Sequence, residues 1–247
     1  MEEPAIFAMP DGRQIAHRVA AGIGPTLVFL PGYMSDMSGS KAGAVFDWAQ
    51  ANGRACLLLD YSGCGASSGE FAEGSLSRWA QEVVALIEAR CAGPVVLVGS
   101  SMGGWLMLLV ALAVPHRIAG LIGIAAAPDF TDWGYDASQK AALESGETLL
   151  EANPYGPEPT PTHPALWRDG QANLVLGGPI ALDCPVRLLH GQSDADVPFK
   201  VSLELAAALH SADVQVTLIK DGDHRLSREA DIALLLRTIA VLVDKAA

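Results

Sequence analysis

Basic residues, cysteines and long apolar runs are all scarce in this sequence, and each scarcity excludes a class of protein. Lysine and arginine total 16 against 28 acidic residues, which gives a formal net charge of −12. A surface of this sign repels nucleic-acid phosphates and anionic lipids, so we expect no nucleic-acid partner and no stable membrane association. The longest apolar runs, such as residues 105–114, reach about ten residues, which is too short to cross a bilayer.

Four cysteines are present, and none shows the C-x-x-C spacing of a redox or zinc motif. The sequence also lacks an H-E-x-x-H motif and a P-loop, while Gly63-x-Gly65 misses the third glycine of a dinucleotide fingerprint. We therefore expect no metal and no cofactor. The start, Met1-Glu2-Glu3-Pro4, is acidic where signal and transit peptides are basic, which together with the cysteine usage predicts a cytoplasmic location.

What the chain does have is a large apolar fraction arranged in alternating strand-like and helix-like segments. Half of the 247 residues are hydrophobic and 18% are charged, which suits one large folded core. Residues 5–9 and 13–19 flank a Pro10-Asp11-Gly12 turn and predict an antiparallel hairpin. The later alternation requires a mostly parallel sheet with right-handed crossovers. We therefore predict a single α/β domain over residues 1–247, with a doubly wound sheet.

The alternation lapses between Pro128 and Cys184. An insertion of this length, at the edge of the sheet where functional groups collect, is typical of a lid, and we predict a lid insertion over residues 129–183. We expect it to be helical over about 136–151, with Asp136 as the cap, and extended through a run of prolines. Its aromatic residues either line an acyl pocket or anchor the lid. The prolines are Pro154, Pro157, Pro159, Pro161 and Pro164, and the aromatic residues are Trp133, Tyr135 and Trp167.

The most informative stretch is Gly99-Ser100-Ser101-Met102-Gly103, a G-x-S-x-G motif between two apolar segments. Residues 94–98 are short and β-branched and predict a buried strand, while residues 102–114 predict a buried helix that stops at a proline. A strand, a tight turn and a helix around this motif form the nucleophile elbow of an α/β-hydrolase fold, which lifts one serine hydroxyl out of the turn. Glycines lie two positions before and two positions after Ser101, whereas Val98 and Met102 occupy those positions around Ser100, so the motif selects Ser101.

In that fold the other two catalytic residues follow the serine in the order Asp or Glu, then His. Residues 186–191 predict the strand that precedes the acid, and two candidates lie in the loop after it. Asp194 fits the G-x-x-D-x-x-V-P arrangement and is favoured, while Asp196 competes with it. His224 directly follows the last predicted strand and is the expected base. His190 ends the strand before Asp194, where we expect a packing role.

Each of these positions predicts a chemical role. A serine hydroxyl is a poor nucleophile at neutral pH, so His224 takes the proton of Ser101 and later returns it to the leaving group. Asp194 holds the imidazole in the useful tautomer and stabilises the imidazolium. Two backbone N–H groups bind the oxyanion, that of Met102 at the start of the helix and that of Tyr33 in the loop after an earlier strand.

The elbow is one of several longer motifs, which occupy residues 29–33, 60–63, 98–107, 184–191 and 223–225. Together they resemble the serine hydrolases of the α/β-hydrolase superfamily, and within it the α/β-hydrolase-domain-containing protein 10 group. The resemblance covers nearly the whole chain. It implies a serine acyl hydrolase acting on thioesters or oxygen esters, such as an S-acyl cysteine or an acyl glucuronide, with Ser101, Asp194 and His224 as the triad. The mammalian member of the group is mitochondrial, but the acidic start of this chain does not resemble a transit peptide.

A carboxylic-ester or thioester hydrolase working through an acyl-Ser101 intermediate is the leading hypothesis, with a small-molecule or acyl-protein ester as its partner. A peptidase or an acyltransferase can use the same triad, because the elbow does not encode the acceptor. A catalytically silent ligand-binding module on the same fold is a further hypothesis. The sequence predicts no oligomeric state.

Overall fold

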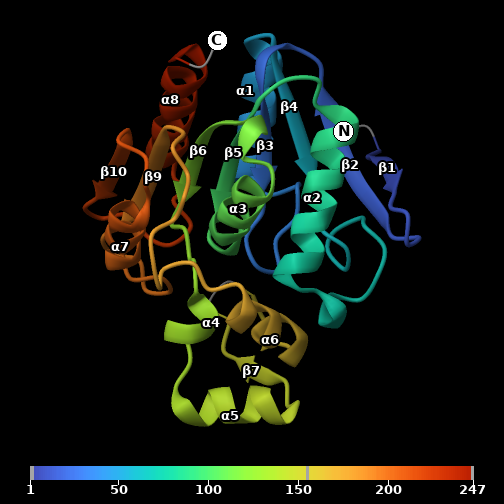
Figure 1. Ribbon diagram of the computed structural model, residues 1–247, viewed down its shortest axis with the longest axis vertical. Coiled ribbons are helices and arrows are strands. Elements are labelled where there is room, and N and C mark those ends of the chain that lie inside the picture. The colour runs from blue at the N-terminus through green and yellow to red at the C-terminus, as the bar shows by residue number, and fades with distance from the viewer. Residues whose placement is uncertain (1–2, 154–155, 246–247) are drawn as a thin grey trace.

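A mostly parallel sheet of eight strands runs through the molecule (Figure 1). The computed structural model describes residues 3–153 and 156–245, and Met1, Glu2 and Pro154, named above, lie outside the described residues. The order of the strands is β1-β2-β4-β3-β5-β6-β9-β10. The β1–β2 and β2–β4 pairs are antiparallel, and the other five pairs are parallel. The predicted hairpin and mostly parallel sheet are therefore confirmed. The strands are β1 (Ala5–Ala8), β2 (Gln14–Ala20), β3 (Ile23–Leu30), β4 (Arg54–Leu59), β5 (Val95–Ser100), β6 (Ile118–Ile124), β9 (Val186–Gly191) and β10 (Val214–Ile219).

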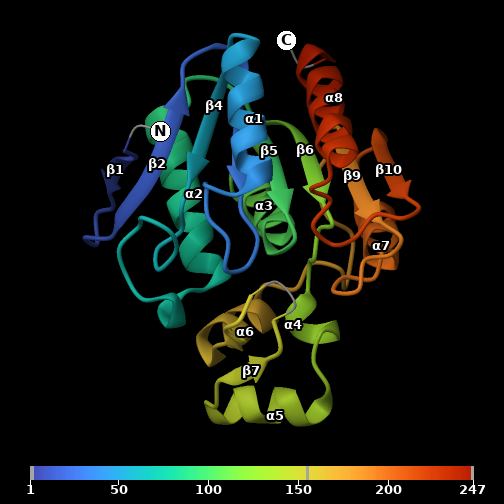
Figure 2. The same cartoon turned by 180° about the vertical axis from the view of Figure 1, so that it is seen from behind.

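Helices cover both faces of this sheet, as the two opposite views show (Figures 1 and 2). One face carries α1 (Ser40–Ala51) and α8 (Glu229–Lys245). The other carries α2 (Leu76–Arg90), α3 (Met102–Ala113) and α7 (Lys200–Ala208). Two short 3-10 helices, Phe71–Glu73 and Pro115–Arg117, lie in connecting segments. Among the described residues, none of the helices combines the length and the apolar character needed to cross a membrane.

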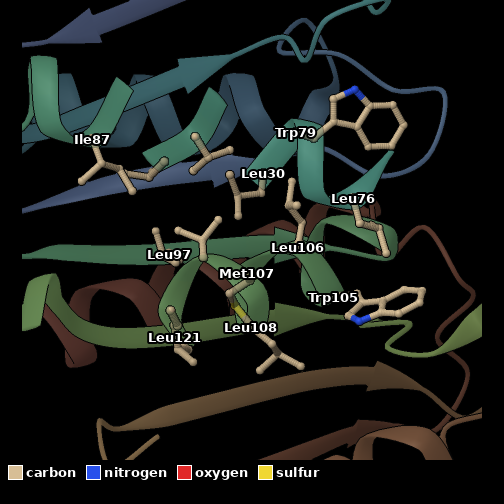
Figure 3. Packing of buried hydrophobic residues seen from close by; sticks show 14 of the residues in the cluster. Leu30, Leu76, Trp79, Ile87, Leu97, Trp105, Leu106, Met107, Leu108 and Leu121 are labelled. Atoms are coloured by element: carbon tan, nitrogen blue, oxygen red, sulfur yellow. The ribbon is translucent and has the colours of Figure 1, made fainter. Parts of the chain in front are cut away.

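Strand β5 is buried on both faces, which explains its uninterrupted apolar sequence. Successive side chains of a strand point to opposite sides. Val95 and Leu97 accordingly belong to the cluster under α2 and α3, whereas Val96 and Val98 belong to the cluster under α1 and α8. Figure 3 shows Leu97 in the first cluster together with side chains of α3 such as Leu106. The apolar run that predicts α3 is therefore a helix packed inside the protein rather than on its surface.

The turn between β5 and α3 needs glycine because backbone segments approach each other closely there. A Cβ atom on Gly99 would lie 2.3 Å from the carbonyl oxygen of Gly103, and one on Gly103 would lie 2.1 Å from the carbonyl oxygen of Leu30. Both distances are far below van der Waals contact. The two glycines of the motif thus allow the start of α3 to lie directly against β3 and β5.

The predicted lid insertion, residues 129–183, lies beyond the carboxyl ends of the parallel strands, at the bottom of Figure 1. Asp136 caps α5 as predicted, since its carboxylate accepts the N–H of Gln139 at 2.9 Å. The predicted helix 136–151 is too long, because Gly146 adopts φ 100° and ends it. The proline-rich part also contains a helix that was not predicted, with Pro164 at its first position, where the fixed φ of proline suits a helix. The elements are α4 (Phe130–Trp133), α5 (Ala137–Ser145), β7 (Leu149–Glu151), β8 (Thr160–Thr162) and α6 (Pro164–Ala172).

The close approach at the start of α3 gives a test of stability. We expect Gly103→Ala to lower the free energy of unfolding by at least about 2 kcal/mol, because the new methyl group must displace the Leu30 carbonyl. Gly43→Ala is the matched control, since Gly43 lies in α1 with open space at its Cβ position, and we expect it to raise stability by about 0.5 kcal/mol. Urea unfolding followed by circular dichroism measures both. Equal effects of the two substitutions would contradict this account.

Candidate active site

Ser101 occupies a strained backbone position at the turn between β5 and α3. Its φ is 55° and its ψ is −120°, a combination that residues with a side chain rarely adopt. Hydrogen bonds on both sides hold it there: its N–H donates to the Ile124 carbonyl at 2.9 Å, and its carbonyl accepts the N–H of Ala127 at 3.1 Å. The Ser101 side chain lines a cleft beneath the lid insertion.

His224 connects Ser101 to Asp194. Its Nε2 lies 3.0 Å from the hydroxyl oxygen of Ser101, and its Nδ1 lies 2.9 Å from Oδ2 of Asp194. An ionised carboxylate only accepts hydrogen bonds, so Nδ1 carries the proton and Nε2 is the acceptor for the hydroxyl. The three residues follow β5, β9 and β10, and the carboxyl ends of these parallel strands bring them together.

Of the two competing acids, Asp194 is the one that meets His224. Its side chain is fully buried, and its Oδ1 accepts the N–H groups of Asp196 at 2.9 Å and of Val197 at 2.8 Å. Burial opposes the ionisation of Asp194, but the hydrogen bonds from His190 and His224 outweigh it and hold the pKa of this carboxyl below its ordinary value. Asp196 is exposed on the same loop. The geometry therefore favours Asp194.

One contact of Asp194 was not predicted. His190, for which we expected only packing, is completely buried, and its Nε2 lies 3.1 Å from Oδ2 of Asp194. The sequence holds a signal for it, a histidine at the carboxyl end of a strand four residues before the acid. Spacing alone does not show that the loop turns back and brings the two side chains together.

Both predicted oxyanion donors lie beside Ser101. Met102 is the first residue of α3, so its N–H has no partner four residues earlier within the helix. Gly32, which precedes Tyr33, lies against Ser101, since a Cβ built on Gly32 would be 3.3 Å from the Cβ of Ser101. Tyr33 and Met102 line the same cleft as Ser101 and His224. The structure thus brings the loop that holds Tyr33 and the start of α3 to the same cleft as the Ser101 hydroxyl.

The cleft has a volume of about 720 Å³ and receives side chains from the core and from the lid insertion. The aromatic residues of the predicted lid insertion occupy two kinds of position. Trp133 and Tyr135 line the cleft, whereas Trp167 is buried in α6 and donates to the Thr131 carbonyl at 3.1 Å. Phe29, Tyr33 and Phe130 add three more aromatic residues to the lining. A cleft with these walls suits an apolar group such as an acyl chain.

Charged groups share the cleft with these rings. Lys41, Arg225, Asp36 and Asp196 all line it. The Lys41 ammonium donates to the Arg225 carbonyl, and burial, together with the positive charge of Arg225, lowers the pKa of Lys41 to about 8. The cleft therefore combines apolar walls with charges of both signs.

Among the described residues, one group of side chains has the spacing of metal ligands. One ligand atom from each of Asp194, Asp196 and His224 lies within 4.8 Å of the other two. Both oxygens of Asp194 and both ring nitrogens of His224 already take part in the hydrogen bonds described above. Hydrogen bonding therefore accounts for the arrangement of this group.

The family model described as alpha/beta hydrolase fold matches residues 25–148. That segment begins in β3, contains the Ser101 turn and ends after α5. The chain belongs to the α/β-hydrolase family, and the predicted fold is confirmed.

Within this family the chain is similar to proteins of one group. It is 41% identical over 236 residues to the Mus musculus protein named palmitoyl-protein thioesterase ABHD10, mitochondrial. The aligned region covers 94% of this chain and 79% of the mouse protein. The solved structure of alpha/beta hydrolase domain-containing protein 10 from mouse matches with a TM-score of 0.92 and 36% identity over 100% of both chains. A putative hydrolase from Agrobacterium vitis S4 matches with a TM-score of 0.90 and 38% identity over 98% of both chains. The predicted resemblance to this group is confirmed.

Tyr33 connects the site to the lid insertion through its side chain. Its hydroxyl donates to the carbonyl of Pro161 in β8 at 2.7 Å, and its ring lies 5.1 Å from that of Phe71. The backbone of the same residue is the predicted oxyanion donor. Tyr33 therefore links the loop after β3 to the lid insertion.

We expect Tyr33→Phe to loosen the lid insertion, because the Pro161 carbonyl loses its donor. A hydrogen bond of this kind contributes about 1 kcal/mol, so amide hydrogen exchange in residues 156–172 should become about fivefold faster. Tyr61→Phe is the matched control, since the Tyr61 hydroxyl donates to the carbonyl of Pro31, outside the lid. Exchange in 156–172 that stays at the wild-type rate in Tyr33→Phe would show that this bond does not hold the lid.

Proposed function

We propose that this chain is a serine hydrolase that cleaves carboxylic thioesters or oxygen esters through an acyl-Ser101 intermediate. His224 acts as the general base and acid, Asp194 orients it, and the N–H groups of Tyr33 and Met102 bind the oxyanion. The observation that carries the proposal is the hydrogen-bonded series Ser101–His224–Asp194 at a strained turn that opens into a large cleft. The lid insertion, residues 129–183, belongs in this proposal to the same single domain as the sheet.

Acylation begins when the Ser101 oxygen attacks the carbonyl carbon of the substrate. His224 Nε2 takes the hydroxyl proton, which turns the ring into an imidazolium, and Asp194 stabilises that charge through Nδ1–H. The carbonyl oxygen becomes an oxyanion and accepts the two backbone N–H groups, each worth about 3 kcal/mol of barrier. The tetrahedral intermediate then collapses, the bond to the leaving group breaks, and His224 gives the proton to the departing sulfur or oxygen.

Deacylation repeats the same steps with water. His224 takes a proton from a water molecule, the resulting hydroxide oxygen attacks the acyl carbon, and the proton returns to the Ser101 oxygen as the acid leaves. A thiol leaving group departs more readily than an alcohol, so the same site serves both classes of ester. No step requires a metal or an organic cofactor.

The relatives support a thioester as the substrate class, because the mouse relative is named a palmitoyl-protein thioesterase. The aromatic lining of the cleft is consistent with an acyl chain. We propose S-acyl groups, acyl glucuronides or small-molecule esters as substrates, and therefore a small-molecule or acyl-protein ester as partner. The proposed cytoplasmic location stays a prediction, since the same relative is named mitochondrial.

Hydrolysis of acyl thioesters and matched oxygen esters with acyl chains from two to sixteen carbons tests the proposal. We expect Ser101→Ala to lower kcat at least about a thousandfold without loss of fold. Ser100→Ala is the matched control, because Ser100 also lines the cleft but does not occupy the serine position of the G-x-S-x-G motif, and the kcat of this variant should stay within about threefold of wild type. Ser101-independent turnover would contradict the mechanism.

The same series separates the other hypotheses. Turnover that rises on addition of an alcohol or thiol acceptor would indicate an acyltransferase. Cleavage of amides without cleavage of esters would indicate a peptidase. A ligand that binds tightly and is never turned over would indicate a silent binding module.

A further inference from the structure

His190 is a second histidine on the carboxylate of Asp194, and the cleft does not include it. The ring is completely buried at the end of β9. Its Nδ1 lies 2.7 Å from the hydroxyl oxygen of Ser202 in α7, and its Nε2 lies 3.0 Å from the Val197 carbonyl and 3.1 Å from Oδ2 of Asp194. The ring therefore bridges the helix α7 and the acid that meets His224.

The partners of the ring fix the position of its proton. Both oxygens near Nε2, a carbonyl and a carboxylate, only accept hydrogen bonds, so Nε2 must carry hydrogen. The Ser202 hydroxyl can donate, so Nδ1 accepts from it in the neutral ring. In this tautomer the Nε2–H of His190 faces Asp194, and the hydroxyl of Ser202 holds the opposite side of the ring.

With this contact the carboxylate of Asp194 has four donors. Oδ1 accepts two backbone N–H groups. Oδ2 accepts the Nδ1–H of His224 and lies 3.1 Å from Nε2 of His190, whose single hydrogen it shares with the Val197 carbonyl at 3.0 Å. A buried anion is costly unless every lone pair is satisfied. Removing His190 leaves Oδ2 with His224 alone, in a side chain that no water reaches.

We propose that His190 is a positioning residue of the reaction: its Nε2–H shares Oδ2 of Asp194 with His224 and fixes that oxygen in line with Nδ1 of His224. This inference rests on the proposed function, because the aligned oxygen matters only when His224 gains a proton from Ser101. His190 touches neither Ser101 nor the cleft, so it acts through Asp194.

The position of the shared oxygen has a consequence for pH dependence. With one donor fewer, Oδ2 holds more negative charge toward His224, which favours the imidazolium and moves the acid limb of kcat/KM to higher pH. Other titratable groups near this pair include Asp196, within 4.8 Å on the same loop, Asp223 and Arg225 on either side of His224, and Lys41, whose ammonium donates to the Arg225 carbonyl. None of them is changed in the variants below.

The test compares His190→Leu, which removes the donor, with Ser202→Ala, which removes a buried hydrogen bond to the same ring but leaves Nε2–H on Asp194. We expect His190→Leu to lower kcat roughly 10- to 100-fold, the range for a hydrogen bond to a charged group, with KM within about twofold. Its acid limb should move up by roughly 0.5 pH unit. Ser202→Ala should lower the melting temperature and leave kcat and the acid limb at their wild-type values.

Two further variants separate positioning from packing. The side-chain nitrogen of glutamine corresponds to Nε2 of histidine, and that of asparagine to Nδ1. His190→Gln should therefore keep a donor on Oδ2 and retain at least about fivefold more kcat than His190→Asn. If His190→Leu does not fold, the comparison of His190→Gln with His190→Asn still tests whether His190 positions Asp194.

A readout that does not need turnover keeps this proposal separate from the proposed function. In the Ser101→Ala background, the low-field proton NMR resonance of His224 Nδ1–H should move downfield in His190→Leu and stay in place in Ser202→Ala. Folded His190→Leu with wild-type kcat and acid limb would overturn the proposal, as would equal kcat in the Gln and Asn variants. A hydrolase without dependence on Ser101 would instead overturn the proposed function, whatever the resonance does.

Discussion

Helix α3 begins so close to β3 that one added carbon atom at Gly103 would collide with the carbonyl of Leu30. This close approach forces the chain through a turn in which Ser101 takes φ 55°, and the hydrogen bond to Ile124 of β6 holds it there. The position of the hydroxyl, the N–H group of Met102 at the start of α3 and the reach of His224 all depend on that turn. The two buried clusters on either side of β5 make the arrangement stable.

Much of this could be predicted because the signals are local. The elbow follows from glycines on both sides of a serine, and Asp194 and His224 follow from loops that come directly after strands of a parallel sheet. The helix α6 could not be predicted, because Pro164 indicates a break unless the chain is known to start a helix there. The contact of His190 with Asp194 depends on the path of a loop, which sequence spacing does not encode.

Two buried carboxylates in this acidic chain show what the imidazoles contribute. Asp129 accepts the N–H groups of Val175 and Leu176, yet burial raises the pKa of its carboxyl. Asp194 accepts two backbone N–H groups as well, but it also has His190 and His224, and its pKa is lowered. Backbone donors alone leave a carboxylate of this kind easier to protonate. The two rings account for the stabilised charge behind the proposed base.

The three groups of the site come from distant parts of the chain: His224 follows Ser101 by 123 positions and Asp194 by 30. During synthesis on a ribosome the serine emerges long before its histidine. In the proposed mechanism the nascent chain therefore carries an unactivated Ser101 hydroxyl until β10 has joined the sheet beside β9. In that mechanism Ser101 becomes reactive only late in folding, when the loop after β10 places His224 beside it.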